Sequence, residues 1–391
     1  MNSIYLDHAA TTPVRPEVFE AMRPLLTERF GNPSSIHRYG REARALLEQA
    51  RERVADALGA ERREILFTSG GTEADNLAVL GGARALGASA VRVAISAIEH
   101  KAVFGAAKQA AHEGAELVVV AVDEEGTLDL DALDHALRRD LNTRPGAICA
   151  VMLGNNEVGT IQPVDEVARI CRVHGALYHC DAVQGFGRVP VRVDRIGFST
   201  LAISGHKIGA PKGIGALFVR RGTALEALTH GGGQERELRP GTENIAGAVA
   251  LGLAAELAVR DLEIERERLR ALRTRLEHEL IERVSDIRIN AGGAERLAHV
   301  LNVSIRHVDQ EALLVSLDLE GVAVSSGSAC QSGTVEPSHV LCAMGRAQPD
   351  EASIRIALGR TTTDAEITQV IHLLPRVIEK LRSPSLATGM L

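Results

Sequence analysis

The chain has 391 residues, of which 45% are apolar, 24% are charged and only 3% are aromatic, with no tryptophan. This composition predicts a globular protein with an aliphatic core and excludes a largely disordered chain. The net charge of −7 and the pI near 6.1 argue against a non-specific nucleic-acid binder, which needs a basic surface, and favour a small-molecule substrate.

From about residue 41 to residue 260, short apolar runs alternate with helical patterns. This alternation predicts an α/β fold with a mostly parallel sheet covered by helices on both faces. One amphipathic helix is expected from 41 to 58, and another is expected to begin at Pro163. The expected strands are 65–68, 91–95, 117–122, 150–153, 176–178, 201–203 and 216–219.

The pattern changes after about residue 260, where a charged helix from Asp261 to Val284 is expected to bridge two domains. Apolar runs near 299–305, 322–325 and 353–358 and a final amphipathic helix then predict a smaller α+β domain. Thr363 and Glu366 form a plausible capping box for that helix. Pro375 is expected to kink or interrupt it.

Two residues suggest the chemistry. Lys207, one of only five lysines, follows an apolar run, and Asp181 ends another, with Gln184 one turn later. A lysine can hold an aldehyde as a Schiff base, and an ionised carboxylate can keep a ring nitrogen protonated, so the pair predicts pyridoxal phosphate. The alternatives are a helix N-cap for Asp181 and a solvated side chain for Lys207.

A glycine turn supplies candidate phosphate ligands. Gly71 and Thr72 lie where a strand, a turn and a helix start follow one another, and a helix N-terminus favours an anion. Ser204 and His206 flank Lys207 and add two further donors. An ordinary strand–helix turn remains the alternative for the glycine motif.

Three further candidate site residues follow a predicted apolar strand or lie within one. His100 follows a predicted strand, where an imidazole can stack on a pyridine ring and exchange protons, or it is a surface histidine. Asn156 can hold a substrate carboxylate or contact the ring hydroxyl, or it stabilises a turn. Arg355 can grip a substrate carboxylate, or lie on the surface. Lys101 is a rival Schiff-base lysine.

The five cysteines show no CxxC spacing, which is typical of a reducing cytoplasm rather than of a disulfide framework or a zinc ribbon. Cys330 lies among small residues from Ser325 to Gly333, a composition that predicts a loop able to carry a thiol into a cofactor pocket. Cys342 is expected to pack in a helix. Cys149, Cys171 and Cys180 are expected in the core. The N-terminus lacks a leader pattern and no apolar run reaches ~18 residues, so a soluble cytoplasmic protein outside the membrane is expected.

Six segments together resemble the cysteine desulfurases of the NifS-like and IscS-like group, in the class V aminotransferase family. They are residues 5–13, 30–37, 68–76, 204–207, 240–244 and 325–330. The resemblance spans nearly the whole chain. It implies a fold-type I pyridoxal-phosphate enzyme that forms a homodimer with sites near the subunit boundary. The expected domains are a large cofactor-binding domain of residues 15–260 and a small domain of residues 1–14 and 261–391, which carries the cysteine loop.

The resemblance also implies residue roles. Lys207 would bind the cofactor aldehyde, Asp181 the ring nitrogen and Gln184 the ring hydroxyl, and His100 would stack and relay protons. The cofactor phosphate would contact Gly71, Thr72, Ser204 and His206, and also Thr242 from the partner subunit. Asn156 and Arg355 would orient the amino acid.

The implied reaction converts L-cysteine to L-alanine and leaves a persulfide on Cys330, without a metal. The sulfur would pass to an acceptor protein such as an iron–sulfur scaffold, or to another thiolation pathway. The alternatives are an aminotransferase or lyase in which Cys330 is incidental, a non-catalytic sulfur carrier, and a selenocysteine lyase.

Overall fold

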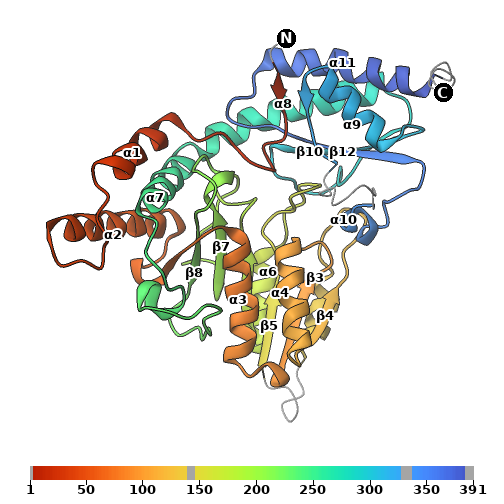
Figure 1. Ribbon diagram of the computed structural model, residues 1–391. Coiled ribbons are helices and arrows are strands. Elements are labelled where there is room, and N and C mark those ends of the chain that lie inside the picture. Colours follow the sequence, from red (N-terminus) through yellow and green to blue (C-terminus); the bar gives the residue numbers. More distant parts are fainter. Residues whose placement is uncertain (1–2, 139–145, 327–336, 384–391) are drawn as a thin grey trace, which may run out of the picture.

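The computed structural model describes residues 3–138, 146–326 and 337–383 (Figure 1). The largest sheet has seven strands in the order β2-β8-β7-β6-β5-β3-β4. β8 runs antiparallel to its neighbours β2 and β7, and the other pairs are parallel, as predicted for an α/β fold. The strands are β2 Ile65–Thr68, β3 Val91–Ser96, β4 Glu116–Val120, β5 Gly146–Ala150, β6 Leu177–Asp181, β7 Thr200–Ser204 and β8 Gly215–Val219.

The central strands are buried along nearly their whole length because both faces of the sheet are covered. Every residue of β7 and β8 is buried. The strand predicted at 150–153 is misplaced, because the strand is Gly146–Ala150. Residues 151–153 are also buried, but they belong to the loop that follows β5. Hydrophobicity alone does not separate these two buried segments.

Helices cover both faces of this sheet. On one face lie α1 Pro16–Thr27, α2 Arg38–Leu58, α5 Leu130–Leu137, α6 Val164–His174 and α7 Ile245–Arg260, which share one hydrophobic cluster with the sheet. On the other face, α3 Gly71–Ala85 and α4 Lys101–His112 pack side by side (Figure 1). Pro163 is the N-cap of α6 rather than its first residue.

A second hydrophobic cluster joins the N-terminal strand to the last part of the chain. It contains the three-stranded antiparallel sheet β12-β10-β9, and β1 pairs in parallel with β11 beside it. In Figure 1, α8, α9 and α11 gather near β10 and the N-terminus. The elements are β1 Ile4–Tyr5, α8 Leu262–Arg283, β9 Ile287–Ile289, β10 Val300–Arg306, α9 Gln310–Leu319, β11 Val322–Ala323, α10 His339–Ala343, β12 Glu351–Ala357 and α11 Asp364–Arg382.

Helix α11 tests two predictions. Its capping box is confirmed, since Thr363 accepts from the backbone N–H of Glu366 and the Glu366 side chain accepts from that of Thr363. The helix is not interrupted at Pro375 and continues to Arg382. Leu374, on the buried face beside the proline, packs in the second cluster, and this packing offsets the missing backbone hydrogen bond.

No helix in the described part of the chain is both long and apolar enough to cross a membrane.

Candidate active site

A cavity of about 520 Å³ lies where the carboxyl ends of the parallel strands meet. Loops after β2, β3, β5, β6 and β7 each contribute side chains to it, because parallel strands end at the same edge of a sheet. Ten predicted site residues line this cavity: Gly71, Thr72, His100, Asn156, Asp181, Gln184, Ser204, His206, Lys207 and Arg355. Thr242 is exposed and does not line it. Cys330 falls outside the described residues.

Lys207 is held by the N-terminal segment. It ends the short 3₁₀ turn Gly205–Lys207 after β7, and its Nζ donates to the carbonyl oxygens of Ala9 at 2.6 Å and Ala10 at 2.7 Å. Burial, followed by the nearby Arg355 guanidinium, lowers the pKa of Lys207 to about 8. A larger fraction of the amine is therefore neutral and nucleophilic than in an exposed lysine. The roles of Ala9 and Ala10 were not predicted, although motif 5–13 contains them.

Asp181 ends β6 and is buried. Its Oδ1 accepts a hydrogen bond from the backbone N–H of Val183 at 2.9 Å, and no helix follows, so the N-cap alternative is wrong. Burial is the main cause that raises the pKa of Asp181 to about 6, and the carboxyl group of Asp75 lies close by. A cationic partner in the cavity would reverse this shift by favouring the ionised form. Gln184 lies one turn further on and donates to the Ala9 carbonyl oxygen at 2.8 Å.

His100 is the N-cap of α4, and its Nδ1 accepts from the backbone N–H of Ala102 at 3.2 Å. The proton of the neutral imidazole is therefore on Nε2, which can donate. Burial lowers the pKa of His100, and the Asp181 carboxylate opposes this shift. The rival Lys101 begins α4 with an exposed side chain that also borders the cavity.

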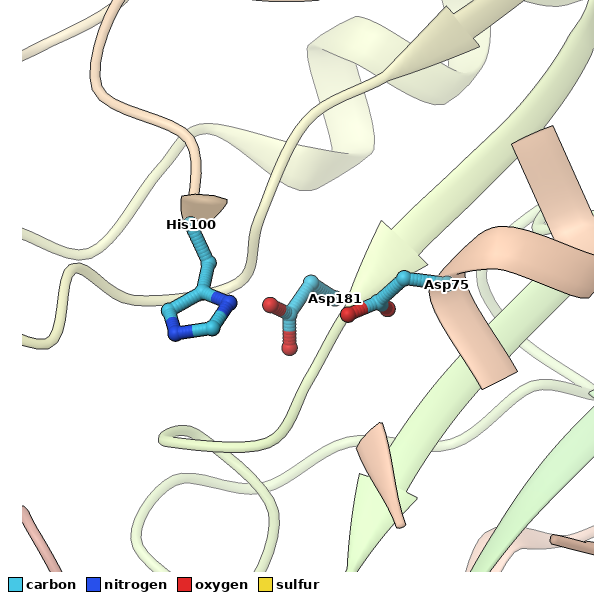
Figure 2. Close-up of side chains that lie close together, drawn as sticks. All are labelled: Asp75, His100 and Asp181. Atoms are coloured by element: carbon cyan, nitrogen blue, oxygen red, sulfur yellow. The ribbon is translucent and has the colours of Figure 1, made fainter. Parts of the chain in front are cut away.

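Figure 2 shows that the side chains of His100, Asp181 and Asp75 converge. A ring nitrogen of His100 and one oxygen of each carboxylate all lie within 4.8 Å of one another. Asp75 comes from the start of the second turn of α3, and sequence reasoning missed it. Its only sequence signal was its place one helical turn after Gly71, which puts it on the same side of α3.

The start of α3 offers a phosphate site. Gly71 is the first residue of the helix, and Thr72 and Ser204 line the cavity beside it. A Cβ at Gly71 would lie 2.6 Å from Cγ2 of Val183, so only glycine fits against that side chain. The backbone N–H groups of the first helical turn have no partners within the helix and attract an anion. His206 contacts Thr11, with Nδ1 and Oγ1 3.2 Å apart.

Arg355 and Asn156 close the other side of the cavity. The guanidinium of Arg355 donates to Oδ1 of Asp7 at 2.7 Å and to the backbone oxygen of Asn156 at 2.9 Å. Its Nε is buried without a hydrogen-bond partner among the residues described. Asp7 therefore orients this arginine, an interaction that was not predicted from the sequence.

The cysteines divide by burial. Cys149, Cys171 and Cys180 are buried, as expected. Cys342 is exposed on α10, so the prediction that it packs in the protein is wrong. The five-residue helix buries its neighbours Val340 and Leu341 instead, which directs Cys342 outward. Ser325 and His339, on the two sides of the cysteine segment, both line the cavity.

This set of donors fits pyridoxal phosphate. An amine with a lowered pKa, a buried carboxylate and an open helix N-terminus face one cavity, which matches an aldehyde, a pyridine nitrogen and a phosphate on one molecule. The imidazole of His100 supplies a flat surface near the carboxylates.

Residues 4–370 match the model of the Aminotransferase class-V family. The chain is 46% identical to "Cysteine desulfurase IscS" of Dictyoglomus turgidum, with 98% of this chain and 96% of the relative covered. A solved "NIFS-like protein" is 33% identical with a TM-score of 0.89 and covers 97% of this chain and 100% of its own. The structure "SspA in complex with cysteine" is also 33% identical, with a TM-score of 0.78 and 91% and 99% coverage. The chain therefore belongs to the aminotransferase class-V family of pyridoxal-phosphate enzymes.

Proposed function

We propose that this protein is a cysteine desulfurase that converts L-cysteine to L-alanine and keeps the sulfur as a persulfide on Cys330. The observation that carries the proposal is that Lys207 and Asp181 meet in one cavity, which is bordered by the described residues on both sides of the cysteine segment. The names of the close relatives and the cysteine-bound neighbour support the same substrate.

The bound cofactor would withdraw electrons from the carbon atoms of the amino acid. Lys207 would hold the aldehyde, and its lowered pKa supplies the free amine that this bond requires. Asp181 would serve the ring nitrogen, whose positive charge would keep this carboxylate ionised. His100 would lie against the ring and, through Nε2–H, holds a proton that it can transfer. Arg355, oriented by Asp7, binds the substrate carboxylate together with Asn156.

Sulfur transfer needs one nucleophile. The Cys330 thiolate attacks the substrate sulfur, and an S–S bond forms while the C–S bond breaks. The electron pair of the broken bond remains on the carbon skeleton, which takes up protons and leaves as L-alanine. A later thiol reductant or acceptor removes the outer sulfur from Cys330.

The test is to supply L-cysteine to the cofactor-loaded protein and to measure alanine, and sulfide after addition of a thiol reductant. Cys330→Ala should still change the cofactor absorbance on binding L-cysteine but should release alanine at least ~100-fold more slowly, the effect expected for loss of a nucleophile. Cys342→Ala, which removes the exposed cysteine of α10, is the matched control and should keep full activity. Mass spectrometry should find added sulfur on the Cys330 peptide. Full activity in Cys330→Ala would favour an aminotransferase or lyase instead.

The proposal includes the assembly and the partner. A homodimer would bring Thr242 of one subunit to the phosphate site of the other, which agrees with its exposed position in the single chain. An acceptor protein in the cytoplasm, such as an iron–sulfur scaffold, would take the sulfur. A pull-down with the persulfide form would identify this acceptor.

We also propose the division into residues 15–260 and residues 1–14 with 261–391. Two separate hydrophobic clusters support it, because Ile4 and Leu6 pack with residues beyond 261 rather than with the large sheet.

A further inference from the structure

Asp75 and Asp181 form a buried pair of carboxyl groups that lines the cavity proposed to bind the cofactor. Their exposed fractions are 1% and 5%, and one oxygen of each lies within 4.8 Å of the other (Figure 2). Neither carboxyl forms an ion pair with a lysine or an arginine among the residues described. Two negative charges at this separation in a buried site repel each other strongly, so one of the two groups should hold a proton.

The surroundings of Asp75 provide an acceptor for that proton. Its Oδ1 lies 3.1 Å from Nε2 of His179, a buried residue of β6. Nδ1 of the same ring lies 2.9 Å from Oγ1 of Thr200 on β7. The carboxyl, the imidazole and the hydroxyl therefore form one buried line of hydrogen bonds that leads away from the cavity.

This inference rests on the proposed function. We propose that Asp75 is a positioning residue that keeps the proton of this pair and uses it to donate a hydrogen bond to Nε2 of His179. His179 then donates its Nδ1–H to Thr200. The negative charge of the pair is confined to Asp181, the carboxylate proposed to face the ring nitrogen of the cofactor.

The charge balance supports this assignment. Burial raises the pKa of Asp75 well above its usual range, and burial lowers the pKa of His179 to about 4, so the ring is a neutral acceptor near pH 7. The other titratable groups around the pair are Glu99, His100 and Lys207. Glu99 is fully buried, and one of its oxygens is unpartnered among the described atoms. As a third acid beside Asp75 and Asp181, it disfavours a second negative charge on that pair.

The test uses the cofactor-loaded full chain, without L-cysteine, so that it reads the protonation state whether or not the protein is a desulfurase. The infrared difference between wild type and Asp75→Asn at pH 7.5 should contain the C=O band of a protonated carboxylic acid. Glu99→Gln is the matched control at the neighbouring buried acid, and the Asp75 band should remain in it. Absence of an acid band from the wild type minus Asp75→Asn difference would overturn the proposal.

A second variant covers a failure of Asp75→Asn to fold. In His179→Leu the Asp75 proton loses its acceptor, so the C=O band of the Asp75 carboxyl should persist at a higher wavenumber. An unchanged band position would contradict the proposed hydrogen bond.

Enzyme kinetics give an independent readout. Asparagine imitates the neutral acid, so the acidic limb of the pH–activity profile of Asp75→Asn should shift less than twofold in proton concentration. A tenfold shift toward lower pH would show that Asp75 carried a charge in the wild type and would refute the assignment.

Discussion

Replacing Asp181 by asparagine should stabilise the cofactor-free protein at neutral and alkaline pH. Burial is the main cause that raises the pKa of Asp181 from 3.8 to about 6, so ionising it in the folded state costs free energy that the unfolded chain does not lose. The difference of about 2 pKa units corresponds to about 3 kcal/mol. Asparagine keeps the oxygen that accepts from Val183 and removes the charge.

The direction in which this stabilisation changes with pH follows from the raised pKa of Asp181. The stabilising contribution of Asp181 to the folded wild type is fully present below pH 3.8, and it is lost as the pH rises through 6. The gain from Asp181→Asn in free energy of unfolding should therefore grow from near zero at pH 4 to about 3 kcal/mol at pH 8. Urea titrations of both cofactor-free proteins across this range measure it. A difference that does not change with pH would refute the reasoning, and the variant should lose at least ~100-fold in turnover if the ring nitrogen needs a charged partner.

The remaining predictions concern the cofactor and the substrate. Lys207→Ala should lose the borohydride-reducible link to the cofactor, whereas Lys101→Ala should keep it; the opposite result would exchange their roles. Gly71→Ala should weaken cofactor binding about tenfold or more, because its Cβ would lie 2.6 Å from Val183, while Gly105→Ala, which meets no atom within 4 Å, should bind normally in the same fluorescence titration. Arg355→Lys should raise KM for L-cysteine about tenfold with a smaller change in kcat, and an unchanged KM in steady-state assays would exclude it from substrate binding.

The sequence by itself determined the α/β class, because apolar runs that are continuous rather than alternating require a sheet covered on both faces. It also located the glycine turn, Asp181 and Lys207, since each follows directly from a strand, and the ends of parallel strands meet at one edge. Local rules were sufficient for the cap formed by Thr363 and Glu366, because all its partners lie within four residues.

Only the tertiary structure decided which distant groups share the cavity. The carbonyls of Ala9 and Ala10 reach Lys207 across almost 200 residues of sequence, and Asp7 reaches Arg355 across 348. Asp75 gave no distinct sequence signal, since its importance comes from its distance to Asp181 and His179. Burial decided the protonation behaviour of these groups, because the pKa of a carboxyl depends on the water and charges around it and not on its neighbours along the chain.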